Sequence, residues 1–159
     1  MNGRYMVCSV VFSVLYRGMR VLVHADERVA AELASLPEGR GVRFKVCADP
    51  KAPELFFRVE NGTVVKEKDK NKKPDLDIIF KNEKMAFRVF TGRMGIPQAY
   101  AAHAFTMRGS IQETMVICRI VDIVEGYLFP WIIAKHIMKE KPTKKCPSIL
   151  VYLRLIPGK

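Results

Sequence analysis

Few residues of this 159-residue chain have types and spacings that could do chemistry. Asp75 and Asp77 alternate along one expected strand, and a carboxylate pair can exchange protons with a substrate. No nucleophile or base accompanies them, and His24, His103 and His136 lack metal-ligand partners at a useful spacing. We therefore expect a protein that is not an enzyme and that has no metal site and no cofactor.

The segment Gly92–Gly95 is the one motif that points to nucleic acid. A GxxG turn between two helices of a basic protein is the layout with which KH domains clamp a nucleic-acid backbone. The motif is short and common, Pro97 and the alanine-rich helix after it are atypical of KH domains, and the lysines lie elsewhere. Nucleic-acid binding through this segment is therefore the least favoured alternative.

Composition indicates one basic domain with many apolar side chains. Apolar residues are 49% of the chain and the formal net charge is +11. An apolar excess indicates a ligand, a partner or a membrane, and the charge favours anionic partners such as lipid headgroups. Cys8, Cys47, Cys118 and Cys146 are widely spaced, as is typical of reduced thiols. We expect a cytoplasmic protein, at most peripheral to a membrane.

An apolar segment at residues 5–24 has a helical stripe of polar side chains, although its many valines keep a strand open as an alternative. We expect it to be a helix enclosed in the core or in a homodimer, or else an interfacial membrane helix. It is too short to span a bilayer by our count, and no signal-peptide cleavage site follows it. The polar residues recur at spacings of four, four, three and four: Ser9, Ser13, Arg17, Arg20 and His24.

The middle of the chain changes from helical to strand periodicity. Asp26 predicts the start of a second helix that runs to Leu36. Strands follow at 42–46 and 54–60, and Asn61-Gly62, a preferred two-residue hairpin turn, leads into a third strand. The loop after it is basic, and we expect it to be solvated or to contact an anionic membrane. Its lysines are Lys66, Lys68, Lys70, Lys72 and Lys73.

The stretch from Pro74 to Gly109 is apolar throughout and is the part around which the chain is organised. It predicts a fourth strand at 76–80, a helix capped by Asn82, a second short helix and a fifth strand at 104–108. A long helix should then run from Ile111 to about Glu125, where Gly126 ends it. Strands and helices cluster, which indicates an α+β fold with a mainly antiparallel sheet.

This order of elements, most specifically from Asp75 to Ile111, resembles the sterol carrier protein type 2 family in a bacterial or archaeal-like stand-alone form. The resemblance implies a five-stranded sheet with helices on one face, which enclose an apolar cavity for a fatty acyl, sterol or isoprenoid chain. It implies lipid binding and transfer without catalysis. The alternative is a scaffold or dimerisation protein with a filled core.

The resemblance covers residues 26–139, with an apolar N-terminal extension at 1–25 and a basic, then apolar, tail at 140–159. By position it implies that a set of mostly aromatic side chains lines the cavity, with Trp131 on a last helix that covers the mouth and touches a membrane. The remaining lining residues are Phe44, Val46, Phe57, Val59, Phe80, Phe87, Phe90, Tyr100, Phe105, Met107 and Met115.

Overall fold

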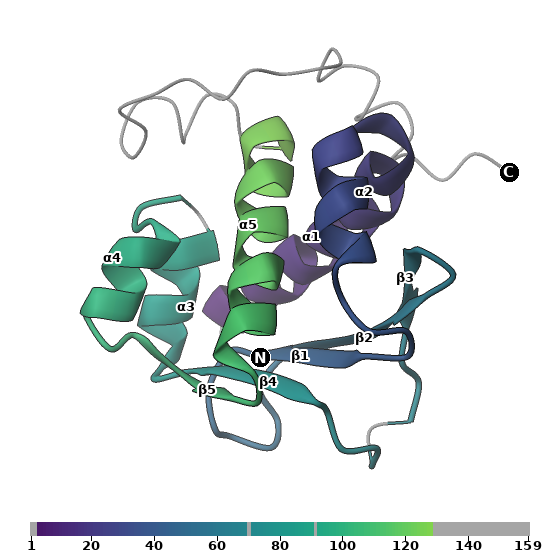
Figure 1. The fold of residues 1–159 in the computed structure, drawn as a ribbon. Coiled ribbons are helices and arrows are strands. Elements are labelled where there is room, and N and C mark those ends of the chain that lie inside the picture. Colours follow the sequence, from purple (N-terminus) through teal and green to yellow (C-terminus); the bar gives the residue numbers. More distant parts are fainter. Residues whose placement is uncertain (1–2, 70, 91, 129–159) are drawn as a thin grey trace, which may run out of the picture.

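The computed structural model describes residues 3–69, 71–90 and 92–128. In this part of the chain five helices lie over one face of a five-stranded sheet (Figure 1). The predicted α+β class, the five strands and their order along the chain are confirmed. The predicted last helix, with Trp131, and the tail at 140–159 lie outside the described residues.

The sheet has the strand order β3-β2-β1-β4-β5. Its central strands β1 and β4 are parallel, and every other pair is antiparallel, as the sequence predicted for most of the sheet. Alternate residues face the helices, so the apolar half of each strand is buried beneath them. The strands are β1 (Gly41–Lys45), β2 (Glu54–Glu60), β3 (Thr63–Lys66), β4 (Leu76–Phe80) and β5 (Phe105–Arg108).

The helices begin where the sequence places their caps. Asp26 accepts a hydrogen bond from the Arg28 N–H, and Asn82 accepts one from the Met85 N–H, 3.0 Å in each case. The turn at Asn61 and Gly62 has φ of 51° and 68°, as a two-residue hairpin of this type requires. The helices are α1 (Gly3–Ala25), α2 (Glu27–Ala34), α3 (Glu83–Phe90), α4 (Ile96–Ala101) and α5 (Ile111–Leu128).

Helix α5 does not end at Gly126, so that prediction is wrong. The helix continues to Leu128, and Gly126 is buried within it. The residues on either side of Gly126 are held by tertiary contacts, because Val124 and Leu128 lie against α1 at Gly18. Such contacts outweigh the roughly 1 kcal/mol that a glycine costs inside a helix.

Segment 5–24 is helical and belongs to the core. Helix α1 contacts α2, α3, α5 and the sheet. Contrary to our count, α1 is long and apolar enough to cross a membrane by length and composition alone, yet 44% of its most apolar 18-residue window is buried in the fold. A boundary at residue 25 remains a prediction, although α1 shares one core with the other elements. Its most buried side chains are Cys8, Phe12, Leu15, Met19 and Leu22.

Candidate functional site

The aromatic cluster formed by Phe12, Phe44, Phe80, Phe90 and Phe105 fills the space between α1, α3 and the sheet. Phe90 lies at its centre, with ring centroids 4.9 Å from Phe12, 5.0 Å from Phe80 and 6.5 Å from Phe44. The ring of Phe105 lies 5.6 Å from that of Phe80. All these pairs meet edge to face, an arrangement that stabilises aromatic contacts beyond simple burial. The interior here is apolar and occupied by rings.

The predicted lining residues do not all lie in this interior. Phe87 and Met107 are half-buried against the core. Tyr100 is 55% exposed, although its ring lies 6.3 Å from that of Phe105, and Met115 is 42% exposed. A lining role for any of these residues stays a prediction. The buried members of the set are Phe44, Val46, Phe57, Val59, Phe80, Phe90 and Phe105.

A pocket of about 240 Å³ lies between α1 and the β2–β3 hairpin, next to the aromatic cluster. We call it the α1–β2 pocket. Buried Phe12 and Leu55 form its apolar part, and Ser9 and Ser13 are exposed. The sequence placed these serines on one polar stripe, but only the fold brings β2 against that stripe. The pocket is also lined by Tyr16, Arg17, Glu54 and Lys66.

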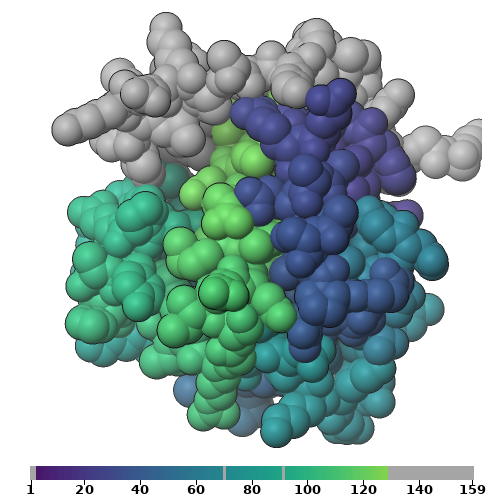
Figure 2. All heavy atoms as spheres, in the orientation of Figure 1, coloured from purple at the N-terminus to yellow at the C-terminus, as the bar shows by residue number. Residues whose placement is uncertain are grey.

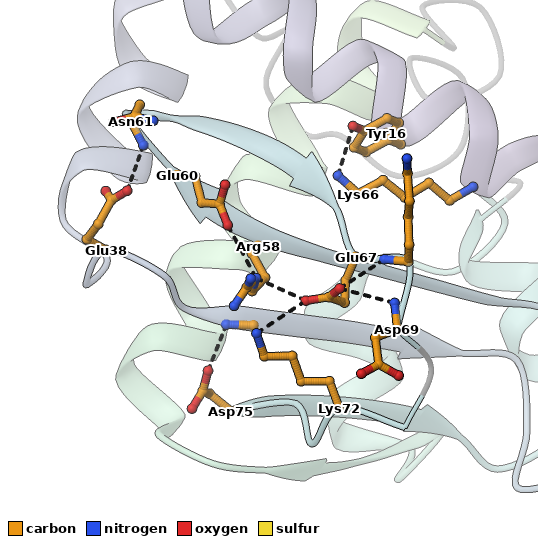
Figure 3. Close-up of polar contacts among 12 residues, drawn as sticks. Tyr16, Glu38, Arg58, Glu60, Asn61, Lys66, Glu67, Asp69, Lys72 and Asp75 are labelled. Atoms are coloured by element: carbon orange, nitrogen blue, oxygen red, sulfur yellow. Dashed lines mark hydrogen bonds and ion pairs between the residues drawn. The ribbon is translucent and has the colours of Figure 1, made fainter.

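The basic loop folds around one carboxylate, Glu67 (Figure 3). Glu67 pairs with Arg58 at 3.0 Å and with Lys72 at 3.6 Å, and it accepts the backbone N–H groups of Lys68 and Asp69. The pKa of Glu67 is therefore lowered, chiefly by the hydrogen bond from Asp69. Lys66, Lys68, Lys72 and Lys73 are exposed, while Lys70 lies outside the described residues.

Asp75 and Asp77 both accept hydrogen bonds within the fold, and of the two carboxylates Asp75 is exposed and Asp77 is buried. Asp77 is 5% exposed and holds the Arg43 guanidinium through two hydrogen bonds of 3.0 and 2.7 Å. Asp75 accepts the Gly41 N–H at 2.7 Å (Figure 3). Asp77 does not lie on an exposed strand face, because the parallel pairing places Arg43 directly beside it.

Two buried carboxylates have contacts or states that the sequence did not reveal. Asp26, besides capping α2, binds the Arg28 guanidinium at 2.6 Å and accepts a hydrogen bond from the Tyr127 hydroxyl at 2.9 Å. Its pKa is lowered to about 2, first by the bond from Arg28. Tyr127 lies on α5, so this contact joins α5 to the start of α2. No local sequence pattern links residues so far apart.

Glu125 is the second of these carboxylates. It is 6% exposed, and its Oε1 has no hydrogen-bond partner among the described residues. Burial raises its pKa to about 8, with a contribution from the charge of Asp122 one turn earlier. Burial also raises the pKa of Asp122 to about 6. Glu125 is therefore largely protonated at neutral pH, a state that reduces the cost of burying it.

The fold places this chain in a known structural class. It matches the apo structure of sterol carrier protein 2 from Yarrowia lipolytica with a TM-score of 0.52 and 13% identity, over 77% of this chain and 93% of that one. The fold is that of sterol carrier protein 2, and the resemblance stated from the sequence is confirmed for the fold. No protein-family model and no curated protein matches.

Two further solved structures are similar at lower scores. One is described as a UbiJ-SCP2 ubiquinone synthesis protein, with a TM-score of 0.48 and 14% identity over 77% of this chain and 95% of that one. The other is the solution structure of sterol carrier protein domain 2 of Helicoverpa armigera, with a TM-score of 0.45 and 16% identity over 72% and 85%.

Proposed function

We propose that this chain binds an apolar lipid between its sheet and its helices, carries it between membranes and catalyses no reaction. The observation that carries the proposal is the fold, which spans 93% of the Yarrowia lipolytica sterol carrier structure. The apolar interior agrees with it, because the aromatic cluster offers rings and not charges to a bound chain.

Burial of hydrocarbon supplies the binding energy in this proposal. Each buried methylene contributes about 0.8 kcal/mol, so a long acyl or isoprenoid chain binds without specific polar contacts. The described interior is filled by the aromatic cluster, so the rings must part when a chain enters. We propose the α1–β2 pocket as the entrance, because it is the place where Phe12 and Leu55 adjoin an open pocket. Such a site accepts apolar chains of several shapes.

Native mass spectrometry of the purified protein, followed by organic extraction, tests the proposal directly. We expect an added mass of a few hundred daltons that is apolar on extraction. Uptake of a fluorescent fatty acid then tests the entrance. Ser13→Trp should slow uptake because it places an indole in the α1–β2 pocket, whereas Val10→Trp should not. Val10 is a matched control because it is 57% exposed on the same helix and does not line the pocket.

An apo mass that stays unchanged after incubation with fatty acids, sterols and isoprenoids would overturn the lipid proposal. Equal uptake by Ser13→Trp and Val10→Trp, with lipid still bound, would overturn only the entrance. If no lipid binds, a filled core used for scaffolding would be the better account. The exposed side chains Met6, Val7 and Val10 favour a homodimer in that case. A protein that remains monomeric at micromolar concentration would exclude it.

We further propose that the basic loop brings the protein, from the cytoplasm, to anionic membranes where lipid is collected. Lys68 and Lys73 are exposed and form no ion pair with a described residue. Each lysine near an anionic surface contributes about 1 kcal/mol, and salt screens this attraction. Binding to anionic vesicles should therefore weaken as salt rises. Salt-independent binding would contradict a role for the loop.

A further inference from the structure

A second pocket, of about 390 Å³, lies on the outside of α3 and is basic. Its lining residues are Arg4, Lys84, Phe87, Arg88 and Arg93. They come from the first turn of α1, from the outer face of α3 and from the turn that follows α3. We call it the basic pocket. Neither the aromatic cluster nor the α1–β2 pocket shares a residue with it.

The spacing of residues along α3 creates one wall of the basic pocket. Lys84, Phe87 and Arg88 are three and four residues apart, so they lie on one face of the helix. The opposite face is anchored in the core by Ala86, Val89 and Phe90. The helix therefore holds Lys84 and Arg88 side by side on its outer face.

The turn after α3 brings Arg93 back over the same face. The Arg88 carbonyl accepts the N–H groups of Arg93 at 2.8 Å and of Met94 at 3.1 Å. Gly92 has a φ of 67°, which reverses the chain, and the side chain of Met94 is 5% exposed and anchors the turn in the core. The Arg93 guanidinium lies 5.7 Å from the centre of the Phe87 ring. This contact orients the guanidinium at the wall of the pocket.

The cations of the basic pocket have few anionic neighbours. Arg4 pairs with Glu83 at 3.0 Å, but its side chain is 53% exposed, and such a pair contributes little. Within the described residues Lys84, Arg88 and Arg93 form no ion pair. Five arginines elsewhere in the fold are paired with carboxylates, whereas Arg17, Arg20 and Arg108 form no ion pair within the described residues. The paired arginines are Arg28, Arg40, Arg43, Arg58 and Arg119.

We propose that the basic pocket binds a phosphate group, carried either by a soluble phosphate ester or by a phospholipid headgroup. Two guanidinium groups and an ammonium suit the tetrahedral oxygens of phosphate, since arginine binds such oxygens in pairs. The bound anion removes the repulsion among cations that have no carboxylate beside them. The Gly92–Gly95 segment thus shapes a small anion site, because Gly92 reverses the chain and brings Arg93 over α3. This site is independent of the interior lipid.

Isothermal titration with inorganic pyrophosphate tests the pocket in the full-length protein. We expect Arg88→Glu with Arg93→Glu to weaken binding at least about tenfold, because each lost charge-assisted hydrogen bond is worth that much. Lys68→Glu with Lys73→Glu in the basic loop changes the net charge by the same amount and should stay within about twofold at equal salt. Arg93→Lys should give an intermediate loss, because it keeps the charge and removes the planar fork. Unchanged thermal unfolding verifies that the variants are folded.

Vesicles distinguish the two sources of phosphate. Binding to phosphatidylcholine vesicles that contain phosphatidic acid, weakened more by Arg88→Glu with Arg93→Glu than by the basic-loop variant, assigns the site to a headgroup. Pyrophosphate binding without vesicle binding assigns it to a soluble ester. Equal losses in the two charge-matched variants, or no binding of either probe by the wild type, would overturn the proposal. Tighter binding of single-stranded RNA than of both probes would overturn it as well.

Discussion

Asp26 satisfies more hydrogen-bond donors than any other buried acid in the described part of the chain. It caps α2, pairs with Arg28 and accepts a hydrogen bond from Tyr127, and it is 1% exposed. The pattern of an aspartate before an apolar helix predicted only the first of these roles. The contact with Tyr127 depends on where α5 lies. A single side chain therefore joins the start of α2 to α5.

We predict that Asp26→Ala lowers the free energy of unfolding by about 2–4 kcal/mol. The estimate combines a lost helix cap with buried donors left without an acceptor. Urea denaturation at neutral pH measures it. Asp49→Ala is the control, because the Asp49 carboxylate accepts the Lys51 N–H in an exposed turn and its removal should cost much less. Equal costs for the two variants would contradict the role given to the Tyr127 contact.

Glu125 should make stability depend on pH. Its pKa is about 8 in the folded protein against 4.5 for an ordinary glutamate, so the folded state keeps a proton that the unfolded chain releases. The free energy of unfolding should therefore fall as pH rises from about 5 to 8. Asp122, with its pKa raised to about 6, contributes in the same direction at the lower end of this range.

We predict that Glu125→Gln removes most of this pH dependence. The variant should be more stable than the wild type at pH 8, by a difference on the order of 3 kcal/mol, and similar to it at pH 5. Urea denaturation at the two pH values measures the slope. Glu113→Gln on the same helix is a control, because Glu113 pairs with Arg40. A wild-type stability that rises over this pH range would exclude a protonated Glu125.

At the scale of elements, glycines decide how closely the parts approach. A Cβ at Gly18 would lie 2.8 Å from the Val124 side chain. Helix α5 therefore crosses α1 at Gly18, although a glycine inside a helix lowers the stability of that helix. A Cβ at Gly109 would lie 2.3 Å from the Asp75 carbonyl oxygen. Gly109 has a φ of 109°, which other residues rarely adopt. It connects β5 to α5 where β4 begins.

We predict that Gly109→Ala costs at least about 3 kcal/mol, because the unfavourable φ and the clash with a backbone atom add together. Gly39→Ala is the matched control. Gly39 also has a positive φ, 76°, but a Cβ there meets nothing within 4 Å. That variant should lose only about 1–2 kcal/mol. Thermal unfolding of the two proteins gives the comparison, and similar losses would show that Asp75 moves aside.

On the scale of the whole molecule, α1 is the element that holds the helical layer together. It contacts α2, α3, α5 and the sheet, and it crosses behind α5 in Figure 1. The space-filling view shows the chain around it as one continuous layer, with α5 between α2 and the α3–α4 pair (Figure 2). If residues 1–25 were a separable extension, their removal would leave the rest of the helical layer intact and the core covered.

We predict that removal of residues 1–25 abolishes cooperative unfolding. Burial of each large apolar side chain of α1 contributes about 1.5–3 kcal/mol, and several such losses exceed the usual net stability of a domain. Circular dichroism during thermal unfolding measures the transition. Met6→Ser with Val10→Ser changes only exposed positions of α1 and should leave the transition intact. A truncated protein that still unfolds cooperatively would show that 1–25 is an extension.

The sequence by itself determined the elements, their order and their caps, because these signals act within a few residues. Asp26, Asn82 and the Asn61-Gly62 turn needed no distant partner to be recognised. Only the tertiary structure decided which residues meet. The hydrogen bond between Asp26 and Tyr127 joins residues 101 positions apart, and the parallel pairing of β1 and β4 places Arg43 beside Asp77. Such contacts follow from topology, so local periodicity predicted neither the burial of Asp77 nor the convergence of cations beside α3.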